Sequence, residues 1–100
     1  MERNTAMELL HAVGIGQISI ARQLINEGHD VNEFSQSGNC PLLEAASRND
    51  TKMVTLLLEN GADAQVEDRK GNTPLCWAQK YKNEPMEELI QANLATKLKP

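Results

Sequence analysis

The fold is decided by two adjoining stretches of the chain, Asn39-Cys-Pro-Leu-Leu-Glu-Ala-Ala-Ser-Arg-Asn-Asp50 and Leu56-Leu-Leu-Glu-Asn-Gly-Ala-Asp63. The first recurs 33 residues later as Asn72-Thr-Pro-Leu-Cys-Trp-Ala78, and a weaker copy stands 33 residues earlier as Met7-Glu-Leu-Leu-His-Ala-Val13. The register is strict, because Gly28 and Gly61 are separated by the same 33 residues. A fixed period of this length is typical of a repeat protein, in which each supersecondary unit stacks on its neighbours.

The central repeat predicts a turn followed by two helices. Gly38 tolerates the positive φ of a tight turn, and Pro41 suits the first turn of a helix because its missing N–H would be unpaired there. We expect this helix over about Pro41–Arg48 and a second helix over about Lys52–Asn60, with a broad aliphatic face. Gly61 stands where a helix commonly ends in a left-handed residue.

The same pattern divides the whole chain into three repeats and a tail. We place the repeats at residues 3–32, 33–65 and 66–92 of a single domain, with a C-terminal tail at 93–100. The outer repeats predict helices over about Thr5–Val13, Ser19–Glu27, Thr73–Lys80 and Glu84–Ala92. Leu94 and Leu98 have helical i, i+4 spacing and extend the last helix, whereas residues 97–100 are expected to fray. Polar substitutions in the first and third repeats predict capping ends and a self-contained module.

The 33-residue period and the Pro-Leu-x-x-Ala-Ala core resemble the ankyrin repeat. The resemblance implies an all-α solenoid of three helix-turn-helix repeats with two short turn or β-hairpin fingers, residues 33–39 and 66–72. The family's signature histidine is replaced by Leu10, Leu43 and Cys76, so we expect apolar contacts in place of its hydrogen bonds. The family also implies a non-catalytic protein–protein interaction module, an adaptor or a stoichiometric inhibitor of a partner bound on the concave face.

Composition narrows the classes of function that remain. The net charge of −4 argues against unspecific binding to nucleic acid or to an anionic membrane. No apolar run is long enough to span a bilayer, and the acidic start of the chain does not resemble a signal peptide, so we expect a cytoplasmic monomer. Cys40 and Cys76 occupy different positions in their repeats and are expected to be separate, buried thiols.

The residues predict no catalytic, metal or cofactor site. His11 and His29 lack ligands at metal-binding spacing, and we interpret both as surface side chains. The sequence Gly14-Ile-Gly16 joins two expected helices without a preceding strand, which excludes a dinucleotide-binding loop. We therefore expect no enzyme and no cofactor.

The candidate partner-binding residues lie on the fingers and the first helices, which form the concave surface in the family. A basic patch there favours a protein partner with an acidic contact surface, although solvated surface charges are the simpler interpretation. The alternative function is nucleic-acid binding by Arg48, Arg69, Lys70 and Lys80, with bases stacked on aromatic rings. The full candidate set is Phe34, Gln36, Asn39, Arg48, Arg69, Lys70, Asn72, Trp77, Lys80 and Tyr81.

Overall fold

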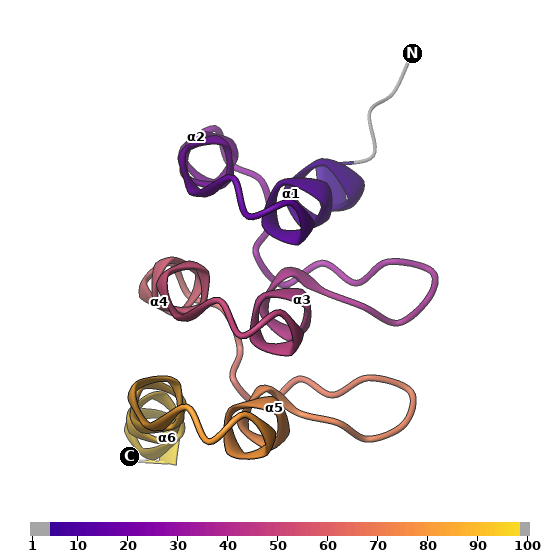
Figure 1. Cartoon of the computed structure of the whole chain (residues 1–100). Coiled ribbons are helices and arrows are strands. Elements are labelled where there is room, and N and C mark those ends of the chain that lie inside the picture. Colours follow the sequence, from indigo (N-terminus) through magenta and orange to yellow (C-terminus); the bar gives the residue numbers. More distant parts are fainter. Residues whose placement is uncertain (1–4, 99–100) are drawn as a thin grey trace.

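The computed structural model describes residues 5–98 and forms three stacked pairs of helices. In chain order the helices are α1 (Thr5–Gly14), α2 (Ile18–Asn26), α3 (Pro41–Ser47), α4 (Thr51–Glu59), α5 (Pro74–Lys80) and α6 (Glu84–Leu98). Figure 1 shows α1, α3 and α5 in an inner column and α2, α4 and α6 in an outer column. The fold class predicted from the sequence is confirmed.

The two fingers, residues 33–39 and 66–72, belong to the long loops that project beside α3 and α5 (Figure 1). Each finger is closed by a pair of backbone hydrogen bonds. In the first, Ser35 N donates to Asn39 O at 2.8 Å and Gly38 N donates to Ser35 O at 3.0 Å. In the second, Asp68 N donates to Asn72 O at 2.9 Å and Gly71 N donates to Asp68 O at 3.0 Å. No residue between 5 and 98 is in a β-strand, so the fingers are tight turns and not stranded hairpins.

Polar side chains that precede α4, α5 and α6 cap the first turns of these helices. Asp50 accepts a hydrogen bond from Met53 N at 3.2 Å, and Asn83 accepts one from Met86 N at 3.1 Å, so both cap outer helices. At α5, the proline at the start is preceded by Thr73, whose hydroxyl accepts from the backbone N–H of Cys76. The predicted bounds of the first five helices agree with the structure to within one residue.

The ends of the outer helices depend on glycine at one register position. Gly28 and Gly61 have φ values of +98° and +91°, and α2 and α4 end just before them. The corresponding position in the third repeat is Leu94, which is half-buried and packs against the core. Helix α6 therefore continues to Leu98, so the end predicted at Ala92 is wrong and the predicted extension is confirmed. Residues 97–98, which were expected to fray, belong to α6, and residues 99–100 lie outside the described range.

The core is aliphatic and is continuous through all three repeats. Helix α4 buries Met53, Val54, Leu56 and Leu57 on its aliphatic face, and Leu58 beside them is half-buried. Burial of such side chains supplies about 1.5–3 kcal/mol each, which makes the core the main source of stability. Six large aliphatic side chains are fully buried: Leu9, Leu42, Met53, Leu57, Met86 and Ile90.

Polar side chains also join the repeats. Because the signature histidine is replaced, the sequence predicts apolar contacts there and does not predict these hydrogen bonds. Asn32 binds the next repeat twice, donating to Gly61 O at 3.1 Å and accepting from Asp63 N at 2.7 Å. Asn83 Nδ2 lies 2.8 Å from both Asn49 Oδ1 and Thr51 Oγ1. The repeats are therefore held together both by apolar stacking and by hydrogen bonds at positions other than that of the signature histidine.

The two cysteines differ, and one prediction is wrong. Cys40 is buried, and its burial raises the pKa of the thiol. Cys76 is exposed because its side chain, unlike that of Leu43 one repeat earlier, is not covered by a following repeat. Both thiols are free. None of the helices in residues 5–98 has the length and apolar character needed to cross a membrane.

Candidate functional site

The inner face, made by the fingers and by α1, α3 and α5, carries three adjoining pockets that we call the inner groove. The first, of about 390 Å³, is lined by Leu10, His11, Gly14, Ile15, Asn39 and Glu44. The second, of about 350 Å³, is lined by Ser37, Gly38, Asn39, Leu43, Glu44, Ser47, Asp68 and Trp77. The third, also of about 350 Å³, is lined by Ser37, Asp68, Arg69, Lys70, Asn72 and Trp77. Shared lining residues make the pockets one continuous surface across the three repeats.

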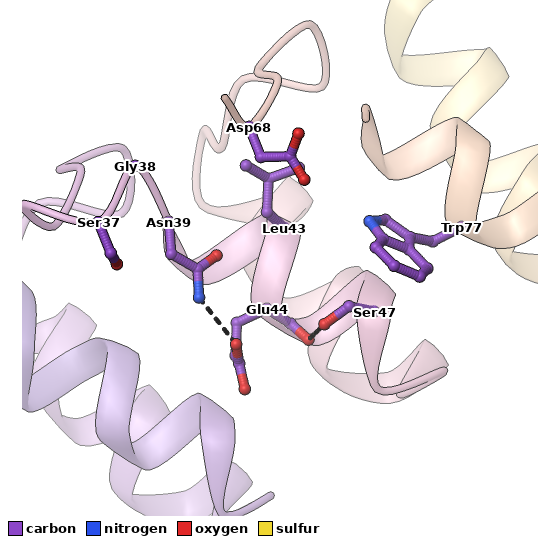
Figure 2. A pocket seen from close by; sticks show the side chains of 8 residues that line it. All are labelled: Ser37, Gly38, Asn39, Leu43, Glu44, Ser47, Asp68 and Trp77. Carbon is purple, nitrogen blue, oxygen red and sulfur yellow. Dashed lines mark hydrogen bonds between the residues drawn. The ribbon is translucent and has the colours of Figure 1, made fainter. Parts of the chain in front are cut away.

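Asp68 shapes the finger of the third repeat. Its Oδ1 accepts hydrogen bonds from Lys70 N at 2.8 Å and Asn72 N at 2.9 Å, and its Oδ2 accepts one from Asn72 Nδ2 at 3.1 Å. The bond from the Asn72 backbone, followed by the one from the Asn72 side chain, lowers the pKa of the Asp68 carboxyl. Asp68 is therefore ionised at neutral pH and holds the finger in one conformation beside the second pocket (Figure 2).

Glu44 lies at the middle of the inner groove, where the first and second pockets meet. Its Oε1 accepts a hydrogen bond from Asn39 Nδ2 at 2.8 Å, and Asn39 Oδ1 accepts one from Cys40 N at 2.9 Å. Figure 2 shows this carboxylate and the ring of Trp77 among the side chains that line the second pocket. The second pocket therefore combines an anionic side chain with an aromatic one.

The rings of Trp77 and Tyr81 pair at the end of the third repeat. Their ring centroids lie 6.3 Å apart with an interplanar angle of 24°. Lys80 Nζ lies 5.1 Å from the centroid of the Trp77 ring, within the range of a cation–π interaction. Trp77 is half-buried and packs against the core, so it serves the framework as well as the groove.

Two predicted binding residues also join the second and third repeats. The hydroxyl of Tyr81 donates to Ser47 O at 2.5 Å. The guanidinium of Arg69 donates to Gln36 O on the preceding finger, and its side chain lies directly over Gly38. A change at Tyr81 or Arg69 therefore alters the stack itself, and neither is a clean probe of binding.

The structure places only half of the predicted residues in the inner groove. Those that line it are Asn39, Arg69, Lys70, Asn72 and Trp77. Those that do not are Phe34, Gln36, Arg48, Lys80 and Tyr81. Phe34 is exposed, but it lies outside the three pockets. Four of these five residues are charged or aromatic, and neither property reports the direction of a side chain.

The sequence reasoning missed Glu44 and His11, although the register could have found them. His11, Glu44 and Trp77 occupy one position of the 33-residue period, and all three line the inner groove. His11 is exposed, but the interpretation of His29 as a surface residue is wrong, since only 12% of its side chain is accessible. The described residues hold no group of three or more His, Cys, Asp and Glu side chains that could bind a metal.

Comparisons with known proteins agree with this architecture. A family model of ankyrin repeats, in three copies, matches residues 9–98. Among solved structures, an ankyrin repeat domain from Acinetobacter baumannii AYE is similar with a TM-score of 0.80 and 32% sequence identity over 85% of this chain. The chain spans 46% of the length of that domain. A comparison with curated proteins found no match. The stacked helix pairs, the fingers and the family match together show that the chain belongs to the ankyrin-repeat family.

Proposed function

We propose that this chain is a non-catalytic module that binds a partner protein in the inner groove, and that it acts as an adaptor or a stoichiometric inhibitor. Ankyrin repeats are generally protein–protein interaction modules. The observation that carries the proposal is the continuity of the three pockets over all three repeats. A groove of this length suits a segment of a macromolecule better than a compact small molecule.

Preorganisation of the groove supports the same function. Asp68 holds one finger through three hydrogen bonds, and Asn39 is bonded both to Glu44 and to the backbone of Cys40. Groups that are already fixed lose little side-chain entropy when a partner binds. An interface of standard size buries about 800 Å² per partner, so three repeats offer a surface of modest but sufficient extent.

The chemistry along the inner groove is mixed, which favours a protein over a nucleic acid. The end at the first repeat is apolar, with Leu10 half-buried and Ile15 51% exposed. The middle carries Glu44 and Asp68, whose carboxylates would repel a phosphate backbone. Positive charge is confined to the finger of the third repeat, where Arg69 already bonds to the chain. These basic groups suit an acidic rim on a protein partner.

A pair of serine-to-tryptophan variants tests the proposal. Ser37 is exposed and lines two of the pockets, whereas Ser19 is exposed on the outer helix α2. A partner is first captured from native cells with the parent chain and identified by mass spectrometry. The purified partner is then titrated against the parent, Ser37→Trp and Ser19→Trp by calorimetry.

Ser37→Trp should weaken binding at least about tenfold, because its ring fills the groove, while Ser19→Trp should bind like the parent. Both variants should melt close to the parent, since exposed substitutions rarely change stability by more than about 0.5 kcal/mol. Equal affinity for the parent and Ser37→Trp would show that the partner uses another face.

A further inference from the structure

The second pocket of the inner groove has a chemistry that the rest of the groove lacks. It lies between the two fingers and the inner helices α3 and α5, and Figure 2 shows its lining residues. Two of them, Glu44 and Asp68, are acidic, one, Trp77, is aromatic, and none is basic. At about 350 Å³, the pocket lies at the low end of the range for ligand sites, which suits one side chain of a larger partner.

The two carboxylates are not equivalent. Asp68 uses both oxygens for the finger, so it contributes charge to the pocket and little bonding capacity. A carboxylate has about four acceptor sites. Glu44 uses one of them for Asn39, and no other side-chain donor within residues 5–98 is bonded to it. Glu44 therefore has capacity for a further donor, including a bidentate one.

Three basic side chains of the third repeat do not line the second pocket. Arg69 donates to the carbonyl of Gln36 along the tips of the fingers. Lys80 lies over the Trp77 ring but does not line the second pocket. Lys70 lines only the third pocket. The cation–π contact of Lys80 also shows that this indole is placed to interact with a cation.

We propose that the second pocket binds a basic side chain, arginine or lysine, from an extended segment of the partner protein. The inference rests on the proposed function and names the group that the inner groove selects. The charged head of the side chain bonds to the free acceptor sites of Glu44, in the field of Asp68. Its stem lies against Trp77 and Leu43. Arginine is the stronger ligand because a planar guanidinium both bonds a carboxylate in bidentate fashion and stacks on an aromatic ring.

Random peptides displayed on phage provide a probe that does not require the native partner. The library is selected against the immobilised chain of residues 1–100, and the recovered peptides are synthesised. Each peptide is also made with its basic residue replaced by a neutral counterpart, citrulline for arginine or acetyl-lysine for lysine. Affinities are measured for the parent, for Glu44→Gln and for Glu59→Gln, the last being a matched charge change on the exposed side of the outer helix α4.

The recovered peptides should share a basic residue, and neutralising it should weaken binding to the parent about tenfold, as expected for a charged hydrogen bond. Glu44→Gln should lose about the same factor for the basic peptide and almost nothing for its neutral counterpart, so the two changes are not additive. Glu59→Gln should behave like the parent. The citrulline and acetyl-lysine peptides test the charge without altering the protein.

The Ser37→Trp variant distinguishes failure of this inference from failure of the proposed function. Peptides that Ser37→Trp rejects, but that lack a basic residue or bind Glu44→Gln as well as the parent, overturn the basic side chain and leave the proposed function standing. A selection that yields no peptide, or only peptides that bind Ser37→Trp as well as the parent, overturns both.

Discussion

The two interfaces between neighbouring repeats differ in how they are held together. We call the interface of the first and second repeats the first seam, and that of the second and third repeats the second seam. The seam between the second and third repeats is joined by Arg69, Tyr81 and Asn83, whose side chains all reach back to the preceding repeat. Their counterparts 33 residues earlier are Gln36, Arg48 and Asp50. In the described part of the chain, the side chains of these counterparts form no hydrogen bond to the first repeat. The first seam is joined by a pair of bonds at Asn32.

The first seam lacks a counterpart to the bonds of Asn83 because both the donor and the acceptors differ there. Asn83 donates to Asn49 and Thr51, but the corresponding residues of the first repeat are Gly16 and Ile18, which have no polar side-chain atom. Asp50 could not donate in any case, because an ionised carboxylate only accepts. A side-chain bond of this kind requires a donor and an acceptor at matched positions. At the first seam Asp50 supplies no donor, and Gly16 and Ile18 supply no side-chain acceptor.

The first repeat is also less completely packed. Ile20 occupies the register position of Met53 and Met86, yet it is 46% exposed whereas both methionines are fully buried. Helix α2 also meets α4 along a shorter stretch than α6 does. The comparison indicates that α2 opens more readily than the other outer helices, α4 and α6.

The largest expected effect tests the packing difference. Leu57→Ala should lower the free energy of unfolding by about 2–5 kcal/mol, because Leu57 is fully buried in the central repeat. Leu24→Ala changes the same register position in the half-buried environment of α2 and should cost clearly less. Urea denaturation followed by circular dichroism measures both. Equal costs would mean that the first repeat is packed as firmly as the second.

A smaller effect tests the polar ties at the second seam. Asn83→Ala removes a helix cap and two bonds to the preceding repeat, so we expect a loss of about 1–3 kcal/mol. Gln17→Ala is the matched control, because Gln17 occupies the same position before α2 and forms no cap. Its cost should stay within about 0.5 kcal/mol. Similar denaturation midpoints for the two variants would contradict the difference between the seams.

Removal of a single hydroxyl sharpens the comparison further. Tyr81→Phe keeps the ring beside Trp77 and removes only the bond to Ser47 O, so it should cost about 0.5–1.5 kcal/mol. Arg48→Ala, at the equivalent position of the second repeat, should leave the melting temperature nearly unchanged. The hydroxyl would have no part in holding the seam if Tyr81→Phe melted with the parent.

The smallest expected effect concerns the reactivity of the two thiols and does not involve the contacts between repeats. Hydrogen bonding to the Thr73 hydroxyl and then to the Thr73 backbone lowers the pKa of Cys76, whereas burial raises that of Cys40. Cys76 should therefore react faster with iodoacetamide, and its rate should rise at a lower pH than that of an ordinary thiol. Thr73→Val should raise the pKa of Cys76 and move the pH–rate curve upward in pH.

Thr73→Ser is the control for this shift, because it retains the hydroxyl. Its pH–rate curve, measured by mass spectrometry of the alkylated peptide, should coincide with that of the parent. A curve for Thr73→Val that also coincides with the parent's would remove the hydroxyl as the cause.

Much of the fold could be predicted from the sequence because its signals are local. Pro41, Gly61 and the aliphatic spacing of residues 53–57 act within one or two turns of a helix. The end of α6 was predicted less sharply: the spacing of Leu94 and Leu98 indicated an extension, and the packing of Leu94 against the core supplies its physical reason. The candidate site was predicted less well: the fingers and Trp77 were found, but Glu44 was missed.

The sequence by itself determined the 33-residue period, the order of the six helices and the residues that form their buried faces, because helix capping and apolar periodicity depend on near neighbours. Only the tertiary structure decided that Tyr81 meets Ser47, that Arg69 lies over Gly38, that Cys76 is exposed and that Glu44 faces the inner groove. These contacts or exposures involve neighbouring repeats. They depend on the offset and rotation with which one repeat stacks on the next, and no local pattern in the chain encodes either quantity.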